Sequence, residues 1–84
     1  MKKKMIRLST INDVKSFVNI CTGCGFDIDL SSGRYTVNAK SIMGIFSLDL
    51  GKPITLEVMQ EGPEVEAFFK EIEGFSAELG VSNG

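Results

Sequence analysis

The sequence has no histidine and no tryptophan, and it contains only two cysteines and two prolines. Without histidine, the chain lacks the side chain whose charge changes near pH 7 and which most often serves as an acid, a base or a metal ligand. No stretch approaches the roughly 20 apolar residues of a membrane-spanning helix, and none forms the apolar region of a signal peptide. We therefore expect a cytoplasmic protein that binds no membrane and no cofactor.

Positive charge is scarce as well. Nine Lys and Arg residues face eleven Asp and Glu residues, which gives a net charge of −2. A chain with this balance has no overall basic field that would hold nucleic acid. The basic cluster Lys2-Lys3-Lys4 is interpreted as a solvated lead-in to the first strand. We expect the partners to be proteins, with no direct contact to nucleic acid.

The two cysteines, Cys21 and Cys24, form a Cys-Thr-Gly-Cys sequence at the point where a helix should end. Redox-active pairs with this spacing open a helix after a strand, so the position favours structural thiols. Zinc would need two further ligands, and no histidine or third cysteine is present, so no metal site is expected. A thiol-redox function for the pair stays open as an alternative, and a depressed thiol pKa would support it.

Hydrophobic periodicity divides the chain into alternating strands and helices. Strands are expected at 5–8, 26–30, 34–38 and 54–59, with a hairpin turn at Ser31-Ser32-Gly33. Helices are expected at 11–22, at 41–50 and from Gly62-Pro63 to Gly80. The order βαββαβα predicts an α+β fold, a four-stranded, mainly antiparallel sheet covered by three helices on one face. We expect a single domain over residues 1–84.

Two helix N-termini carry capping residues. Thr10 can accept the backbone N–H of Asp13, whose carboxylate complements the positive helix end. Ser41 caps the second helix in the same way. The first helix should bury one apolar stripe and the last helix a second one. These stripes are Val14, Phe17, Val18 and Cys21, and then Val65, Phe68, Phe69, Ile72, Phe75 and Leu79.

The second helix has more apolar residues than a short helix can bury. We expect Ile45 and Leu48 to lie in the core, with Ile42, Met43 and Phe46 at least partly outside it. An exposed apolar patch rimmed by polar residues is typical of a site for a protein partner. Burial of all five residues in the core is the alternative.

The element order and the stretch Val37-Asn38-Ala39-Lys40-Ser41-Ile42-Met43-Gly44-Ile45-Phe46-Ser47-Leu48 together resemble the HPr phosphocarrier family of the bacterial phosphotransferase system. The stretch is similar to the regulatory serine signature of that family, and the fold implied is the HPr-like open-faced β-sandwich. The resemblance implies that Ser41 is a target of an ATP-dependent serine kinase. It also implies that Ile42, Met43 and Phe46 form a surface that partner proteins bind, with Lys40 adding positive charge beside Ser41.

The resemblance fails at the residues that carry phosphate in the family. Its Gly-Ile-His-Ala-Arg-Pro motif corresponds here to Leu8-Ser9-Thr10-Ile11-Asn12-Asp13. Thr10 occupies the position of the histidine and Asn12 that of the arginine. A threonine hydroxyl lacks the near-neutral ionisation of imidazole, and losing the arginine removes a bidentate phosphate clamp. Asp13 would also repel an incoming anion, so no catalytic residue is expected.

We therefore expect a non-catalytic, HPr-like regulatory or adaptor protein in the phosphotransferase system or in carbon catabolite repression. It would not be an enzyme. Its partners would be a serine kinase or phosphorylase, a transcription regulator or a metabolic enzyme. Two alternatives remain open: a phosphocarrier with a displaced acceptor at Ser9 or Thr10, and a thiol-redox module that uses Cys21 and Cys24.

Overall fold

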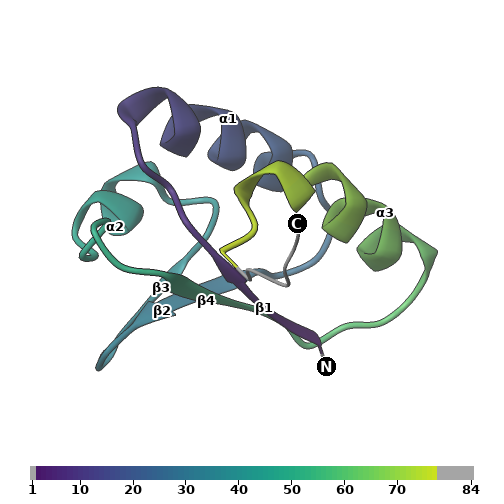
Figure 1. Ribbon diagram of the computed structural model, residues 1–84. Coiled ribbons are helices and arrows are strands. Elements are labelled where there is room, and N and C mark those ends of the chain that lie inside the picture. The colour runs from purple at the N-terminus through teal and green to yellow at the C-terminus, as the bar shows by residue number, and fades with distance from the viewer. Residues whose placement is uncertain (1, 78–84) are drawn as a thin grey trace.

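Strands and helices alternate in the order that the sequence predicts (Figure 1). The computed structural model describes residues 2–77. Its elements are β1 (Lys2–Ile6), α1 (Ile11–Thr22), β2 (Asp29–Ser32), β3 (Tyr35–Asn38), α2 (Ile42–Phe46), β4 (Ile54–Val58), α3 (Pro63–Glu71) and the 3₁₀ turn η1 (Glu73–Phe75).

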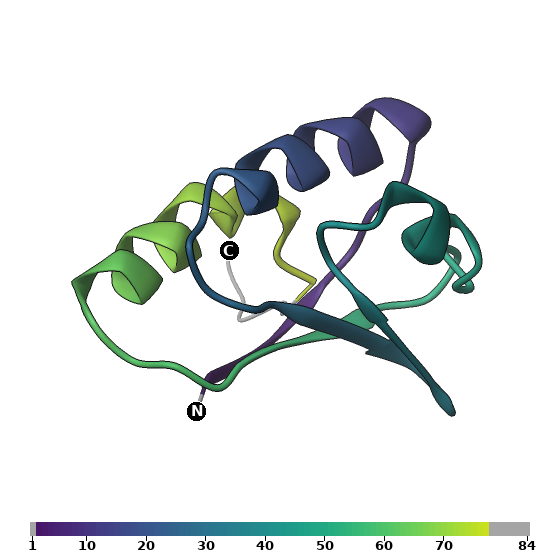
Figure 2. The same cartoon turned by 180° about the vertical axis from the view of Figure 1, so that it is seen from behind.

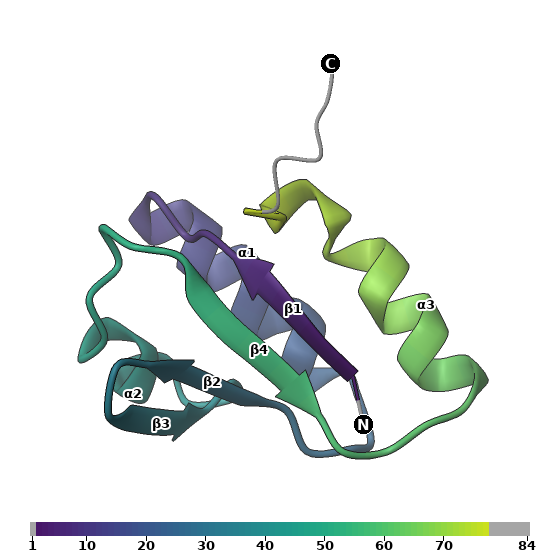
Figure 3. The same ribbon diagram turned by 60° about the horizontal axis from the view of Figure 1, so that its bottom comes forward.

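The strands form one antiparallel sheet in the order β1-β4-β2-β3. The helices lie on one face of this sheet, and no helix among residues 2–77 covers the other face (Figures 1 and 3). Seen from behind, α1 crosses above the sheet, with α2 and α3 at opposite sides of it (Figure 2). The predicted α+β open-faced sandwich is confirmed.

Every second residue of β4 faces the helices, which explains the alternation of that segment. Ile54, Leu56 and Val58 are fully buried, whereas Thr55 and Glu57 between them are half-buried. Edge-to-face aromatic pairs join the helices to the rest of the core. In one of them, the ring centroids of Phe26 and Phe68 are 5.7 Å apart. The buried apolar side chains are Ile6, Leu8, Val14, Phe17, Cys21, Phe26, Ile28, Leu30, Ala39, Ile45, Leu48, Ile54, Leu56, Val58, Val65, Phe68 and Ile72.

The interpretation of the lysine cluster as a lead-in is wrong, because Lys2–Ile6 forms β1 itself. β1 lies at the edge of the sheet and pairs with β4 from Lys2↔Val58 to Ile6↔Ile54. Lys2 donates to Glu66 Oε2 on α3 at 2.8 Å, and its ammonium lies 5.5 Å from the centre of the Phe69 ring. Lysine is a common device for an exposed edge strand, because it discourages pairing with another chain.

β2 begins three residues later than predicted and the hairpin turn is shifted along with it. Phe26 and Ile28 are buried, yet both precede the strand. Their alternation with polar residues correctly predicts that they are buried, but it does not show that they pair with a neighbouring strand. The turn consists of Gly33 and Arg34, because Ser32 pairs with Tyr35. Gly33 has φ of +60°, which glycine adopts without steric cost.

Two helices are shorter than predicted. α2 ends at Phe46, because the Gly44 carbonyl accepts both the Ser47 N–H at 3.1 Å and the Ser47 hydroxyl at 2.6 Å. α3 ends at Glu71 and tightens into η1. Leu79 and Gly80, predicted to finish the last helix, lie outside the described residues. Within residues 2–77, no helix is long and apolar enough to cross a membrane.

Candidate functional site

The N-terminus of α1 is closed by a reciprocal capping box. Thr10 has extended backbone angles, and its Oγ1 accepts the N–H of Asp13 at 3.0 Å. In return, Asp13 Oδ2 accepts the N–H of Ser9 at 3.0 Å and that of Thr10 at 3.3 Å. The predicted cap at Thr10 is confirmed. Its partner carboxylate takes up backbone donors that an anion would otherwise use at a helix N-terminus.

This capping box decides what the α1 terminus can do chemically. The Thr10 hydroxyl is a cap acceptor, and the nearby carboxylate of Asp13 is bonded to backbone N–H groups instead of the hydroxyl. No hydrogen bond between a base and the Ser9 or Thr10 hydroxyl exists within residues 2–77. The first turn of α1 therefore presents a negative charge and an unactivated hydroxyl.

Ser41 caps α2, as predicted. Its backbone is extended and its Oγ accepts the N–H of Gly44 at 3.2 Å. Gly44 is the residue that makes this close approach possible. A Cβ atom at Gly44 would lie 3.2 Å from both Ser41 Oγ and the Val37 side chain, and the sequence analysis did not single this glycine out. Ser41 itself is exposed.

Lys40 precedes Ser41, but its ammonium is directed elsewhere. Lys40 Nζ donates to the backbone carbonyl of Cys24 at 2.9 Å, in the loop that follows α1. Its own N–H donates to Asn38 Oδ1 at 2.7 Å. Lys40 is half-buried and ties the start of α2 to the end of α1. The Lys40 ammonium therefore binds the Cys24 carbonyl and does not interact with Ser41.

The apolar run on α2 is divided between core and surface. Ile45 is fully buried and Leu48 is 6% exposed, whereas Met43 is 78% and Phe46 40% exposed. Ile42 is half-buried and packs against the core. The expectation that Ile45 and Leu48 lie inside, with the other three at least partly outside, is confirmed.

Ile11, at the start of α1, is a further apolar residue that is 61% exposed. It precedes the predicted buried stripe of α1, which begins at Val14. α1 packs against α2, and its N-terminal half lies beside α2 in both views (Figures 1 and 2). We call Ile11, Ile42, Met43 and Phe46 the α1–α2 patch.

The two thiols lie at the far end of α1 and both are reduced. Burial raises the pKa of the Cys21 thiol to about 12, with a smaller contribution from Cys24. Burial and the Glu71 carboxylate also raise the pKa of Cys24, against the lowering effect of Lys40. Reactive cysteines have depressed pKa values, so these two thiols have the properties of structural residues.

Comparison with known protein families gives a match. A model described as the PTS HPr component phosphorylation site matches residues 13–78, a span that contains Ser41 and begins just after Asn12. A comparison with curated proteins gave no match.

Two solved structures are similar to the chain over most of both lengths. One, described as HPr-C-His from Thermoanaerobacter tengcongensis, has 26% identity and a TM-score of 0.70, and covers 88% of this chain and 93% of that one. The other is a phosphocarrier protein HPr from Bacillus anthracis, with 29% identity, a TM-score of 0.63 and coverage of 89% and 93%. With the family model matching most of its length, this chain belongs to the HPr phosphocarrier family of the phosphotransferase system.

Proposed function

We propose that this HPr-family chain is a non-catalytic regulatory or adaptor protein. It binds protein partners through the α1–α2 patch and is controlled by phosphorylation at Ser41. The observation that carries this proposal is the contrast between two helix N-termini. The α1 terminus is filled by the Asp13 carboxylate, whereas the α2 terminus keeps an exposed serine beside exposed apolar side chains.

Loss of phosphoryl relay is supported by the chemistry of α1. A relay needs a nucleophile that ionises near neutrality and releases its phosphate readily, and no residue of the sequence is a histidine. A phosphate on Thr10 would approach the Asp13 carboxylate, which already accepts the Ser9 and Thr10 N–H groups. Displacing that carboxylate would also remove half of the capping box. A carrier with a displaced acceptor at Ser9 or Thr10 is therefore disfavoured.

Control at Ser41 is supported by local geometry. Ser41 is an exposed residue at the surface end of α2, so a phosphate on it needs no rearrangement of the core. A phosphoserine carries about 1.5–2 negative charges and can accept N–H groups of the first helical turn, so it suits an N-cap position. The new charge would lie one residue from Ile42 and two from Met43. It would change the patch while leaving the fold intact.

The partner surface is supported by exposure. Met43 and Ile11 are each more than half exposed and occupy neighbouring helices. A partner that covers them would present an apolar surface, and flexible methionine adapts to differently shaped partners. A serine kinase or phosphorylase, a transcription regulator and a metabolic enzyme are the candidate partners. In this proposal Lys40 acts by fixing the position of α2 through its bond to Cys24.

Capture of partners from a bacterial lysate by immobilised variants tests the proposal. Met43→Ser should lose the captured protein, whereas the matched variant Met59→Ser should retain it, because Met59 is 66% exposed on a different part of the molecule. Ser41→Asp should change capture relative to Ser41→Asn. Both side chains cap helices, so only the charge differs between these two variants. Equal capture by Met43→Ser and Met59→Ser would contradict the proposal.

A further inference from the structure

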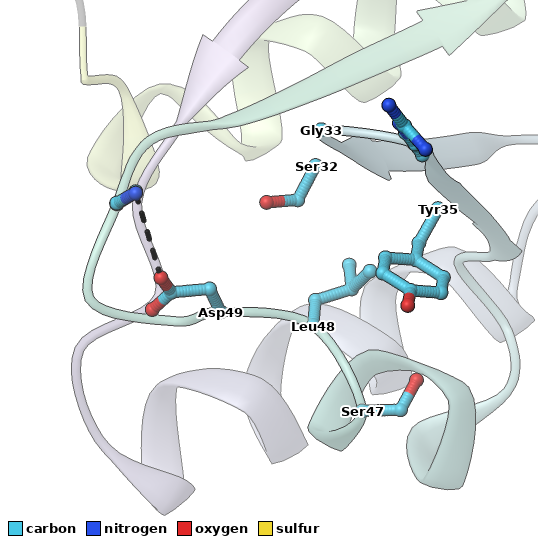
Figure 4. Close-up of a pocket in the computed structure, with 8 residues that line it drawn as sticks. Ser32, Gly33, Tyr35, Ser47, Leu48 and Asp49 are labelled. Atoms are coloured by element: carbon cyan, nitrogen blue, oxygen red, sulfur yellow. Dashed lines mark ion pairs between the residues drawn. The ribbon is translucent and has the colours of Figure 1, made fainter.

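A cavity that the α1–α2 patch does not include lies between the β2–β3 turn and the loop that joins α2 to β4 (Figure 4). Its volume is about 430 Å³, within the range of about 300–1,000 Å³ that small-molecule sites occupy. One wall comes from the turn and the other from the loop. The lining residues are Ser32, Gly33, Arg34, Tyr35, Ser47, Leu48, Asp49 and Lys52.

Each wall carries a cation. Arg34 is exposed, and its guanidinium has no ion-pair or hydrogen-bond partner among residues 2–77. On the other wall, Lys52 Nζ lies 3.9 Å from Asp49 Oδ2, a long ion pair between two well-exposed side chains, drawn as the dashed line in Figure 4. Such an exposed pair contributes little to stability, so Lys52 can readily leave Asp49 for an anion that binds it more tightly. The cavity therefore holds two cations and one anion, in a chain whose net charge is −2.

The cavity also offers an aromatic ring and free hydroxyl groups. Tyr35 is 71% exposed, and its ring lies next to Leu48 (Figure 4). The Ser32 hydroxyl points into the space between the walls in the same view. Neither the Ser32 nor the Tyr35 hydroxyl has a hydrogen-bond partner within the described segment. An aromatic face and an aliphatic side chain together suit a flat ring, and the hydroxyls can donate to an anion.

The backbone fixes both walls. Gly33, at φ of +60°, makes the tight two-residue turn that projects Arg34 and Tyr35. On the loop, Asp49 Oδ1 accepts the N–H of Gly51 at 3.0 Å, which holds the carboxylate on its own side of the cavity. The backbone from which each cationic side chain extends is therefore held by short-range hydrogen bonds, while the exposed side chains can adjust to a ligand.

We propose that this cavity binds a small phosphate monoester that carries a flat ring. The phosphate lies between Arg34 and Lys52, and the ring lies against the exposed ring of Tyr35. Arginine favours phosphate because its planar fork donates two parallel hydrogen bonds, and lysine adds a compact charge. A dianion binds more tightly because it can interact with both cations at once. A monoanion or a neutral ring makes fewer such contacts and binds more weakly. This site is independent of Ser41 and of the patch.

Phenyl phosphate is the probe, with inorganic phosphate, benzoate and benzyl alcohol as comparisons. Titration of the ¹⁵N-labelled protein should shift the amide resonances of residues 32–35 and 47–52. Phenyl phosphate should bind more tightly than each of the other three, because it alone combines a dianion with a ring. Shifts concentrated elsewhere on the molecule, or equal affinity for phenyl phosphate and benzyl alcohol, would overturn the proposal.

Three substitutions distinguish specific binding in this cavity from nonspecific electrostatic attraction to the protein. Arg34→Gln should weaken phenyl phosphate about tenfold, as expected for losing a charge-assisted hydrogen bond. Lys15→Gln removes the same charge from an exposed position on α1 and should leave the affinity nearly unchanged. Asp49→Asn should strengthen binding several-fold, because it removes the anion that competes for Lys52. Equal effects of Arg34→Gln and Lys15→Gln would show a general charge effect and overturn the site.

The ring contact needs its own test. Tyr35→Ala should weaken phenyl phosphate and leave inorganic phosphate unchanged, because the latter has no ring to place against Tyr35. Tyr35 is exposed, so the variant should fold, and its amide spectrum away from the turn reports this directly. If Tyr35→Ala binds phenyl phosphate as tightly as the wild type, the proposed ring contact is wrong.

Discussion

The Asp13 carboxylate occupies part of the α1 N-terminus. It accepts the backbone N–H groups of Ser9 and Thr10, beside the first-turn N–H groups that a helix N-terminus offers to a phosphate. In the proposed loss of phosphoryl relay, two features act together: no residue of the sequence is a histidine, and the Asp13 carboxylate already accepts the Ser9 and Thr10 N–H groups.

Thr10→Ala tests the cap. The substitution leaves the Asp13 N–H without its acceptor and should lower the free energy of unfolding by about 0.5–2 kcal/mol in urea denaturation. Ser16→Ala is the control, because Ser16 is exposed within α1, and alanine there should slightly raise stability. Partner capture should be unchanged by Thr10→Ala. Lost capture at full stability would give Thr10 a functional role that this account lacks.

The Cys21 thiol predicts how stability depends on pH. Its pKa is raised from 9.0 to about 12 in the folded protein by burial, so the unfolded chain loses this proton first as the pH rises. The stabilisation is complete below pH 9 and is lost between pH 9 and 12. In that window the free energy of unfolding should fall by up to about 1.4 kcal/mol per pH unit from this group.

Comparison with Cys21→Ala isolates the contribution of this thiol, because every other side chain is the same in both proteins. Urea denaturation at pH 8 and pH 10.5 should show a smaller loss of stability in the variant. The wild-type thiols should also react slowly with iodoacetamide at neutral pH. Rapid alkylation of Cys21 in the folded protein would revive the thiol-redox alternative.

At the scale of elements, α2 has one face in the core and one face exposed. Its buried residue Ile45 anchors it to the core, and its exposed residues Met43 and Phe46 belong to the patch. Only five residues are helical, so tertiary packing stabilises α2 far more than helix propensity does. Its position depends on Ile45, on the Ser41 cap and on the bond from Lys40 to Cys24.

Neighbouring residues of α2 should therefore respond differently to truncation. Ile45→Ala should cost about 2–5 kcal/mol of stability, as for a fully buried side chain. Phe46→Ala should cost only about 1–2 kcal/mol, because the ring is 40% exposed, yet it should abolish partner capture. Thermal denaturation and capture measure the two effects separately. A larger stability loss in Phe46→Ala than in Ile45→Ala would mean that Phe46 is a core residue.

Gly44 should be required for the cap of α2. Gly44→Ala would place a Cβ 3.2 Å from Ser41 Oγ and from the Val37 side chain, so the cap must open or the helix must move away from β3. We expect a net loss of about 1 kcal/mol despite the better helix propensity of alanine. Gly25→Ala, where a Cβ meets nothing within 4 Å, should be tolerated. A gain in stability for Gly44→Ala would show that the crowding relaxes without loss.

At the scale of the whole molecule, periodicity and caps predicted the element order, the sheet and the Thr10 and Ser41 caps. These follow from local sequence, because alternation, the 3.6-residue repeat and capping residues act within a few positions. The extent of β1 and the later start of β2 were missed. Each depends on where a partner strand ends: β1 on β4, and β2 on β3 and β4.

The candidate site was predictable in composition but not in contacts. The missing histidine and the exposed residues of α2 could be read from the sequence. The bond from Lys40 to Cys24 and the cavity at Arg34 and Lys52 could not, because each joins segments that only the folded chain brings together.

The central claim is that phosphorylation has been lost from α1 and kept at Ser41. Intact-mass measurement after two parallel incubations tests it: one with phosphoenolpyruvate and the first enzyme of the phosphotransferase system, the other with ATP and an HPr-type serine kinase. The account predicts no phosphate in the first incubation. In the second it predicts one phosphate, which Ser41→Ala abolishes. Acid-labile phosphate acquired from phosphoenolpyruvate, or a kinase product that persists in Ser41→Ala, would contradict it.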